Sequence, residues 1–399
     1  MSDPVQPGIF YRKQEAAPEF YRLVTFNFAA DLAREIAAEA IADLWAVLSD
    51  LQQGIVRDLL PSRDGDPEIR VNSAGLVPTL CLGTKLFRAG GMLADRAPTD
   101  TPQLGTRPFA ALRWDEGAEK KAAQTDFAIA LHAESELGVA RAVVELQKRI
   151  TDRQLPVKMV CFFAGLHRDD RRSWIDFHDG INNMESGVQR RVALQVVQND
   201  ADWLLGGSTM LFLKIAIDLQ GWRALPRAVQ EALVGRDKLT GCPLDHVDVI
   251  AGGTLAPISV TGCPMTGQIP SRGPFVEVPE QAHDRIVIAS HIHRANLVRG
   301  GPEQMQANRI FRQGYEFVDS PPVGGVRVGL NFVSFQNDFD RVVQILDTQN
   351  WMRDVNFGGI AGDPNVPAFS LMSIIAGGYF LIPPVGDPFP GAAAFAPSA

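Results

Sequence analysis

Residues 126–163, DFAIALHAESELGVARAVVELQKRITDRQLPVKMVCFF, carry the pattern that decides the fold. The apolar runs at the two ends, 126–131 and 157–163, are typical of strands. Between them, residues 136–150 place apolar side chains at the three- and four-residue spacing of an amphipathic helix. This stretch therefore predicts a strand, a helix and a second strand.

The residues before this stretch extend the pattern toward the N-terminus. Residues 22–28 (RLVTFNF) predict a strand, and a long apolar face from Asp31 to Leu59 predicts a helix that Pro61 ends. Residues 76–82 predict another strand. The first half thus reads strand, helix, strand, strand, helix, strand.

The second half repeats this order, although its second strand cannot be placed from the pattern. Its predicted elements are a strand at 209–217, a helix at 227–234, a strand at 327–336, a helix at 338–349 and a strand at 377–383. We therefore expect an α+β fold of two ferredoxin-like units, each βαββαβ, whose antiparallel sheets pack together. The expected units are residues 1–200 and 201–385, followed by a flexible tail at 386–399.

The composition narrows the class of protein. The chain has 399 residues, of which 46 are acidic and 38 basic, and its net charge of −8 argues against nucleic acid as a partner. Its apolar runs are shorter than the roughly 20 residues that cross a bilayer. Four cysteines are too few for a disulfide scaffold, and the N-terminal residues show no export signal. We expect a cytoplasmic protein that binds neither nucleic acid nor membrane.

Three polar segments are candidates for chemistry. The first, WIDFHDGINN (174–183), follows the strand at 157–163, and its Asp-Gly pair is ordinarily a tight turn. The second, ASHIHRAN (289–296), follows residues 284–288, whose alternation predicts a strand. The third is NRIFRQGYEF (308–317), whose arginines would ordinarily be solvated charges over apolar neighbours.

The spacing of the histidines and cysteines along the sequence does not predict a metal ion bound by side chains alone. A lone histidine such as His291 or His293 is more often a structural residue than a ligand, and no third ligand lies at a recognisable zinc spacing. Cys242 and Cys263 each stand in Thr-Gly-Cys-Pro, which is a natural turn without a C-x-x-C pair.

Taken together, the three polar segments resemble those of the dye-decolourising peroxidases. The F-x-D-G-x-x-N pattern of that family matches Phe177, Asp179, Gly180 and Asn183. Its H-I-x-R-A-N segment matches residues 291–296, and its R-I-x-R-x-G-Y segment matches residues 309–315. Each motif is weak alone, but their order and spacing are specific.

The resemblance implies a haem peroxidase in which the two ferredoxin-like units enclose a haem b pocket. It places His291 on the iron, Asp179 as the base and then acid that moves the peroxide proton, and Arg312 as the cation on the breaking bond. The other implied cofactor contacts are Phe177, Gly180, Asn183, His293 and Arg294, the last two toward the haem propionates. The implied substrates are H2O2 and a small aromatic reductant, such as a phenol or a dye.

The sequence departs from the family pattern at two places. Asp176 stands where many members have glycine, and its carboxylate would raise the pKa of Asp179 if the side chains met. Members often place an acid near the last strand, where it bonds the second nitrogen of the iron-bound histidine, but residues 369–372 (FSLM) contain none. The alternatives for that role are Asp347, Asp354 and Asp363.

Three other functions stay open at this point. A haem carrier or sensor of the same fold would bind haem without useful turnover. A deferrochelatase-like protein would release iron from haem. A cofactor-free oxygenase or isomerase would keep the motifs without haem. The sequence decides neither the physiological reductant, nor a surface radical site, nor the choice between a monomer and a homo-oligomer.

Overall fold

The computed structural model describes most of both halves of the chain. The described residues are 4–9, 18–56, 69–98, 125–179, 187–197, 199–241, 244, 285, 288–297, 309–322, 324–346, 357–364 and 367–396. Several residues named above lie outside them: Gly180, Asn183, Cys242, Cys263, Asp347 and Asp354.

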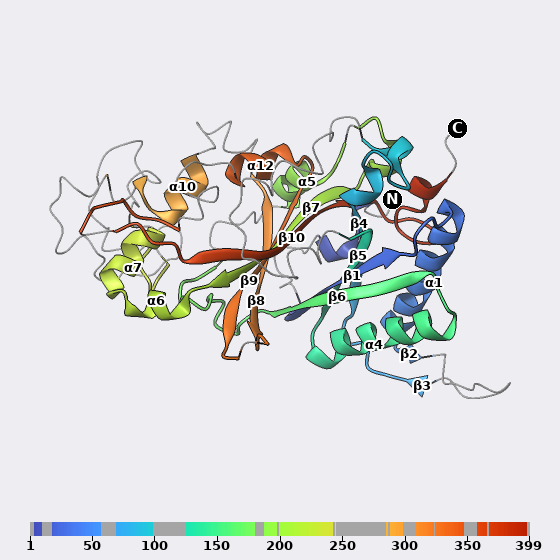
Figure 1. Ribbon diagram of the computed structural model, residues 1–399, viewed down its shortest axis with the longest axis horizontal. Coiled ribbons are helices and arrows are strands. Elements are labelled where there is room, and N and C mark those ends of the chain that lie inside the picture. The colour runs from blue at the N-terminus through green and yellow to red at the C-terminus, as the bar shows by residue number, and fades with distance from the viewer. Residues whose placement is uncertain are drawn as a thin grey trace.

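The first half has the predicted order of elements. It consists of β1 (Phe20–Phe28), α1 (Arg34–Gln52), β4 (Val77–Gly83), β5 (Phe127–Ala133), α4 (Glu136–Asp152) and β6 (Val157–Leu166), with the short strands β2 (Ile55–Val56) and β3 (Ile69–Arg70). The hydroxyl of Ser135 accepts a hydrogen bond from the Gly138 amide at 3.2 Å and so caps α4. α1 and α4 lie together at one end of the molecule (Figure 1).

The second half supplies the strand that the sequence pattern did not place. Its elements are α5 (Gly187–Leu194), β7 (Ser208–Ile217), α6 (Leu219–Ala224), α7 (Arg227–Val234), α10 (His291–Leu297), β8 (Phe311–Asp319), β9 (Arg327–Gln336), α12 (Asp340–Leu346) and β10 (Met372–Ile382). The described residues also form the 3-10 helices η1 (Pro7–Ile9), η2 (Thr84–Phe87), η3 (Ala94–Arg96), η4 (Asp202–Leu204) and η7 (Ala392–Phe395). The new strand, β8, carries the arginine-containing third polar segment.

The eight long strands form one closed antiparallel ring in the order β1-β5-β4-β10-β7-β9-β8-β6. Both halves contribute four strands in the same relative order, β6-β1-β5-β4 and β10-β7-β9-β8, as in a ferredoxin-like unit. Only narrow seams join them, since β6 pairs with β8 through Leu166 and Glu316. The predicted α+β fold with antiparallel sheets is confirmed, whereas the domain boundary at residue 200 stays a prediction.

The space between the two four-stranded sheets is filled by side chains from every long strand. They include Tyr21, Cys81, Ala128, Phe163, Phe212, Tyr315, Phe335 and Phe380. Because side chains alternate along a strand, the intervening residues of β7, β8 and β9 point to the outer face of the second sheet. That outer face is where the cavity described below lies.

Two predicted elements differ from those in the structure. The first helix ends at Gln52 rather than at Leu59, because Gly54 adopts a left-handed φ of 72° and the chain then enters β2. The strand expected at 284–288 is wrong: Arg285 and Ile288 are helical, and the Ala289 amide donates to the Arg285 carbonyl at 3.1 Å.

The tail expected to be flexible, residues 386–399, is described up to Ala396, and its flexibility stays a prediction. Phe389 and Phe395 are 1% and 3% exposed, and their ring centroids lie 5.9 Å apart. Both rings belong to the core cluster that includes the inner face of α1. Their burial holds the segment against the first half, although the segment has no helical or strand periodicity.

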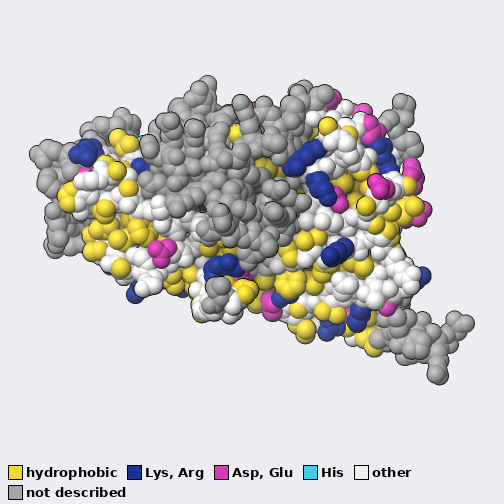
Figure 2. Space-filling model, viewed as in Figure 1, with side chains coloured by type: hydrophobic (Ala, Val, Ile, Leu, Met, Phe, Trp, Pro, Cys, Tyr) yellow, Lys and Arg dark blue, Asp and Glu magenta, His cyan; other side chains and the backbone are white. Residues whose placement is uncertain are grey.

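Charged and apolar side chains are mixed on the described surface. Figure 2 shows basic and acidic side chains scattered among hydrophobic ones over the end that holds α1 and α4. The Arg22 guanidinium, for example, lies 4.9 Å from the ring centroid of Phe162, which is 46% exposed, and it pairs with Glu136. Among the helices that the structure describes, none combines the length and apolarity needed to cross a bilayer.

Gln6 closes the other seam of the ring, between β4 and β10. Its side-chain amide donates to the carbonyls of Leu80 at 3.1 Å and of Pro383 at 2.8 Å, and its oxygen accepts from the Leu80 amide at 2.8 Å. The side chain is buried, with 1% exposure. One residue near the N-terminus thus satisfies main-chain groups on both sides of this seam.

We predict that Gln6→Ala lowers the free energy of unfolding by about 1–3 kcal/mol, because it leaves buried main-chain groups without partners. Urea unfolding followed by circular dichroism measures the change. Gln147→Ala on α4, which removes an exposed amide, is the matched control and should stay within about 0.5 kcal/mol of wild type. Equal stability of the two variants would contradict the role given to Gln6.

Candidate active site

A cavity of about 240 Å³ lies on the outer face of the second sheet. Strands β7 to β10 form one wall, and α10, α12 and residues 173–179 form the others. Most of its lining is apolar, including Ile175, Phe177, Leu213, Ile215, Leu330, Phe332, Ile345, Phe357 and Met372. Such a cavity suits an apolar ligand that carries a few polar groups.

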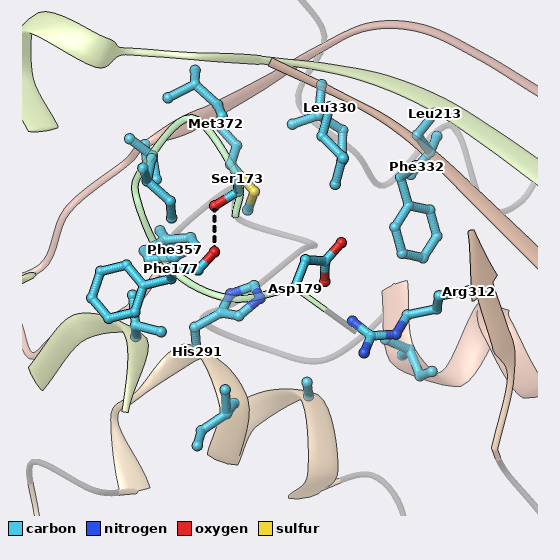
Figure 3. Close-up of a pocket in the computed structure, with 18 of the residues that line it drawn as sticks. Ser173, Phe177, Asp179, Leu213, His291, Arg312, Leu330, Phe332, Phe357 and Met372 are labelled. Atoms are coloured by element: carbon cyan, nitrogen blue, oxygen red, sulfur yellow. Dashed lines mark hydrogen bonds between the residues drawn. The ribbon is translucent and has the colours of Figure 1, made fainter. Parts of the chain in front are cut away.

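His291 is the first residue of α10 and points into this cavity (Figure 3). The hydroxyl of Ser290 accepts from the His293 amide at 3.4 Å, which caps the helix at its start. The His291 ring stacks on Phe357 with centroids 4.4 Å apart. Burial, and then the charge of Arg312, lower the pKa of His291 to about 4. The imidazole is therefore neutral near pH 7, which is the form that binds a metal ion.

The His291 imidazole forms a hydrogen bond with the main chain of Phe357. This hydrogen bond acts to raise the pKa of His291, against the effect of burial. Asp363, one of the predicted acids, instead pairs with Arg285 at 3.2 Å. Asp347 and Asp354 lie outside the described residues.

The loop from the end of β6 to Asp179 is folded by its own main-chain hydrogen bonds. The Ser173 amide donates to the Phe177 carbonyl at 2.9 Å, and the Asp179 amide donates to the Arg171 carbonyl at 3.1 Å. Within the loop, these hydrogen bonds satisfy main-chain groups that no longer pair with a neighbouring strand after β6 ends. They place Asp179 at the end of an ordered turn, with its carboxylate directed into the cavity (Figure 3).

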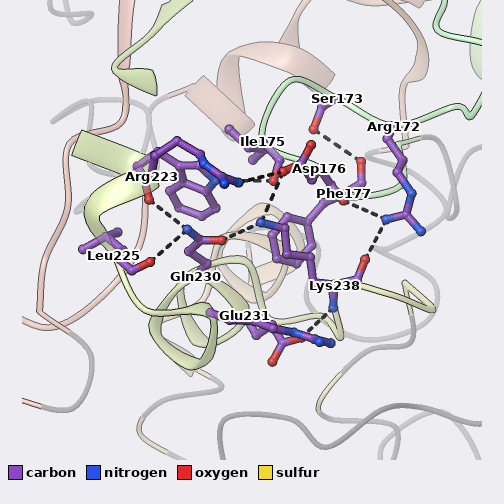
Figure 4. Close-up of polar contacts among 12 residues, drawn as sticks. Arg172, Ser173, Ile175, Asp176, Phe177, Arg223, Leu225, Gln230, Glu231 and Lys238 are labelled. Atoms are coloured by element: carbon purple, nitrogen blue, oxygen red, sulfur yellow. Dashed lines mark hydrogen bonds and ion pairs between the residues drawn. The ribbon is translucent and has the colours of Figure 1, made fainter. Parts of the chain in front are cut away.

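A polar network ties this loop to the segment that follows α7 (Figure 4). The Arg172 guanidinium donates to the carbonyls of Asp176, Lys238 and Leu239, each at 2.7 Å. The Lys238 ammonium donates to Gln230 on α7 at 2.6 Å. The loop is thus fixed to the second half by several bonds at once.

Phe177 anchors the same loop through apolar packing. Its ring is 3% exposed and meets Trp222 edge to face, with centroids 6.2 Å apart. On its other side, the Lys238 ammonium lies 5.6 Å from the ring centroid. Phe177 both lines the cavity and holds the turn that ends at Asp179.

Asp176 occupies a left-handed backbone position, with φ at 67°. Glycine adopts this conformation without a Cβ penalty, which explains the glycine of the family pattern at this position. The Asp176 carboxylate lies 3.3 Å from Arg223, 3.5 Å from Lys238 and 3.9 Å from Arg168. The Asp176 carboxylate thus contacts three cations.

β8 brings Arg312 to the cavity. Phe311 and Tyr315 fill the space between the sheets, so the alternate residues Arg312 and Gly314 face outward. Oδ2 of Asp179 lies 3.0 Å from the point where a Cβ would stand on Gly314. The carboxylate therefore rests close to the β8 main chain, two residues along the strand from Arg312.

Two further arginines line the cavity, Arg236 and Arg309. Arg236 is 9% exposed and donates to the Gly241 carbonyl at 2.7 Å, and burial followed by the charge of Arg312 lowers its pKa to about 10. The same two causes lower the pKa of Arg309. Three guanidinium groups around one apolar cavity favour an anionic ligand, because an anion offsets their mutual repulsion.

The structure brings some predicted site residues together and separates others. The cavity lining includes Phe177, Asp179, His291 and Arg312. The described lining does not include His293 or Arg294, and Arg294 donates to the Gly359 carbonyl at 2.8 Å. Gly180 and Asn183 lie outside the described residues.

The sequence profile described as Dyp-type peroxidase, C-terminal, matches residues 170–386. These residues hold every polar side chain of the cavity lining. The chain belongs to the Dyp-type peroxidase family. It is an oxidoreductase that acts on peroxide with a haem cofactor.

Relatives and solved structures agree with this assignment. The dye-decolorizing peroxidase of Thermobifida fusca is 26% identical over 353 residues, which are 84% of this chain and 72% of that protein. The Escherichia coli K12 deferrochelatase is 26% identical over 180 residues, which are 42% of this chain and 35% of that protein.

Two solved structures match nearly the whole chain. The DyP-type peroxidase of Cellulomonas bogoriensis has a TM-score of 0.69 and 22% identity, covering 98% of this chain and 96% of its own. Ferric DtpA of Streptomyces lividans has a TM-score of 0.69 and 20% identity, covering 98% and 95%. This likeness supports the fold of the DyP-type peroxidase described above.

Sequence reasoning left two site residues of this DyP-type peroxidase without a role. Arg309 opens the R-I-x-R-x-G-Y segment, so the motif marked it although no chemistry was assigned to it. Arg236 follows the left-handed Gly235 at the end of α7, and that helix C-cap was the available signal that the chain turns there. Neither signal shows, before the fold is known, that these two arginines line a cavity.

We predict that Asp176→Gly is more stable than Asp176→Ala by about 1 kcal/mol. Both variants lose the contacts with the three cations, but only alanine keeps a Cβ in the left-handed conformation. Comparison of the two free energies of unfolding isolates the backbone effect. An alanine variant at least as stable as the glycine variant would show that the backbone is not strained at this position.

Proposed function

We propose that the cavity binds haem b, with His291 as the protein ligand of the iron, and that the enzyme uses H2O2 to oxidise small aromatic reductants by one-electron steps. One observation carries the proposal. A neutral, buried imidazole shares an apolar cavity with a carboxylate, Asp179, and a guanidinium, Arg312. A peroxidase needs these three groups together.

The residues of the cavity fit a haem group. Apolar side chains from the second sheet suit the macrocycle, and the neutral imidazole of His291 can bind the iron. Arg236 and Arg309 are the lining cations available to pair with the two propionates, in place of His293 and Arg294 as first expected. Phe177 completes the wall, and contacts from Gly180 and Asn183 stay a prediction.

The haem supplies the redox chemistry of peroxide reduction. Asp179 takes the proton from one oxygen of H2O2 and returns it to the departing oxygen, so that water leaves. The Arg312 guanidinium stabilises the negative charge that develops as the O–O bond breaks. Complete reduction of one H2O2 to two waters takes up two electrons and two protons.

The reductant supplies the two electrons in separate steps. A phenol or an aromatic dye suits this role because its ring can lose a single electron. We propose an aromatic reductant of this kind, as expected from the sequence. The similarity to the dye-decolorizing peroxidase of Thermobifida fusca supports the same class.

Iron release from haem is the second candidate, because the matching deferrochelatases are known by that activity. The match covers 42% of this chain. Asp179 and Arg312 in the same cavity favour peroxide chemistry instead, since removal of iron breaks no O–O bond and needs no cation placed to stabilise its charge. A haem carrier would likewise not need this pair.

The decisive experiment is the absorption spectrum of haem-supplied protein before and within milliseconds of one equivalent of H2O2. A Soret band that changes at once, and returns when a phenol is added, supports the peroxidase. A Soret band that peroxide leaves unchanged indicates a carrier or sensor. Conversion of haem to metal-free porphyrin indicates iron release, and the absence of any Soret band overturns the proposal.

We predict that Asp179→Ala and Arg312→Leu keep haem but react with H2O2 about 10²- to 10⁴-fold more slowly, as is usual for loss of a proton-transfer group or a charge-stabilising donor. Stopped-flow absorption at the Soret band measures the rate. Arg312→Lys, which keeps the charge without the planar fork, should fall between wild type and Arg312→Leu. A wild-type rate in Arg312→Leu would refute the role of this arginine.

We predict that His291→Ala loses haem, because the other histidine of the described lining, His178, has its Nε2 2.8 Å from the Arg172 guanidinium. His293→Ala is the matched control on the same helix, and it should retain haem. Titration with haem, followed by pyridine haemochrome analysis after gel filtration, gives the bound fraction. Equal haem loss in both variants would point to disruption of α10 rather than to ligation by His291.

A further inference from the structure

Glu316 is a buried carboxyl group next to the proposed site. It is 5% exposed and lies on β8, where alternation places it on the same face as Arg312 and Gly314. Oδ2 of Asp179 lies 3.0 Å from the Cβ position of Gly314, which is the next residue on that face. Asp179 is therefore flanked along one strand by a guanidinium on one side and a carboxyl group on the other.

The neighbours of Glu316 include residues of β6, of β9 and of the loop that leads to Asp179. The Trp174 amide donates to its Oε2 at 3.4 Å. Its strand partners are apolar, Leu166 on β6 and Leu330 on β9. The charged groups that act on it are Asp179, Arg168 and Asp170, all on the loop that packs against β8.

This environment keeps Glu316 protonated near neutral pH. Burial, and then the negative charge of Asp179, raise the pKa of Glu316 to about 8. The Trp174 amide and Arg168 act in the opposite direction but do not cancel the rise. A neutral carboxylic acid beside an aspartate can donate a proton to that aspartate. A second ionised carboxylate would instead repel the aspartate's negative charge.

Two of the charged side chains that act on Glu316 are partly exposed at the surface. Arg168 and Asp170, which act electrostatically on Glu316, form an ion pair at 2.6 Å with side-chain exposures of 22% and 39%. The loop that carries them is the one that ends at Asp179. Glu316 thus lies between a carboxylate in the cavity and a charged turn at the surface.

We propose that Glu316 is a proton-exchange partner of Asp179, linking the cavity to solvent at the 168–174 turn. The inference rests on the proposed role of Asp179. Reduction of H2O2 takes up two protons, and Asp179 alone only moves a proton between the two oxygens. The Glu316 acid gives its proton to the Asp179 carboxylate, and solvent then returns a proton to the Glu316 carboxylate. Only O–H bonds form and break in this exchange.

The first test uses haem-free protein and infrared spectroscopy. Wild type should show a carboxylic-acid C=O band that shifts in D2O and disappears as the pH rises through about 8. Glu316→Gln should lack this band, and Glu145→Gln, which changes an ion-paired carboxylate on α4, should keep it. In Asp179→Asn the band should disappear at lower pH, because a negative neighbour is lost.

A band that persists in Glu316→Gln, or a titration that Asp179→Asn leaves unchanged, would overturn the proposal. Glutamine keeps the shape and the acceptor for the Trp174 amide, so the variant is expected to fold. Thermal unfolding of each variant checks that expectation, and Glu316→Asp, which keeps an acid, should restore the band if folding is preserved.

The second test uses haem-supplied protein and the pH profile of its turnover with H2O2 and a phenol, because the two protons are taken up together with the electrons of the reductant. Because the acid form donates, the wild-type rate should be level below about pH 8 and fall above it. Glu316→Gln should be at least about 10-fold slower and lose this descent. Glu316→Asp should recover part of the rate and a descent at a shifted pH.

The outcomes separate the two proposals. If wild type reacts with H2O2 and Glu316→Gln gives the same rate and the same profile, the role of Glu316 is wrong and the peroxidase stands. If wild type does not react with H2O2 although haem is bound, the proposed function fails, and the role of Glu316 fails with it. A slower Glu316→Gln with an unchanged profile would indicate a structural effect only and would also overturn the inference.

Discussion

β8 has to present two different faces at once, and the site depends on this constraint. Phe311 and Tyr315 fill the space between the sheets, while Arg312, Gly314 and Glu316 alternate with them on the cavity side. A slip of one residue would exchange the two sets and bury a guanidinium among aromatic rings. Continuous pairing with β9, from Phe311 to Asp319, excludes that slip. The register of one strand pair therefore sets the positions of the charged groups.

The wall of the cavity formed by residues 173–179 is a loop rather than part of a sheet, and side-chain contacts hold it in place. Arg172 bonds three carbonyls, Lys238 bonds Gln230, and Phe177 packs on Trp222. Each of these contacts acts on the loop rather than on a ligand. A site built partly on a loop needs such support, because small displacements of a reactive group weaken catalysis.

The sequence predicted most of the fold because most strands and helices bury one regular face. β9 and α7 were predicted with the bounds that the structure has, since their apolar periodicity is unbroken. β8 was missed because Arg312, Gln313, Gly314 and Glu316 interrupt its apolar alternation. The residues that obscured the strand are the ones that serve the cavity, so a functional requirement overrode the local pattern.

The site was predicted only as far as its motifs reach. The resemblance placed Asp179, His291 and Arg312, which do line one cavity. It could not place Arg236, because its role depends on how α7 turns in space. It also could not show that Asp176 contacts cations while the charge of Asp179 acts on Glu316, since both interactions arise from the packing of a loop on a strand.

The position of β10 in the ring has a consequence for how the protein is made. The last long strand of the chain lies between β4 from the first half and β7 from the second, and residues 4–9 cover its junction with β4. Until the C-terminal residues leave the ribosome, the β4 edge of the first half therefore lacks the strand that pairs with it in the folded protein. Such edges invite pairing with other chains. Synthesis of the final strand is thus the event that turns an association-prone nascent chain into a closed molecule.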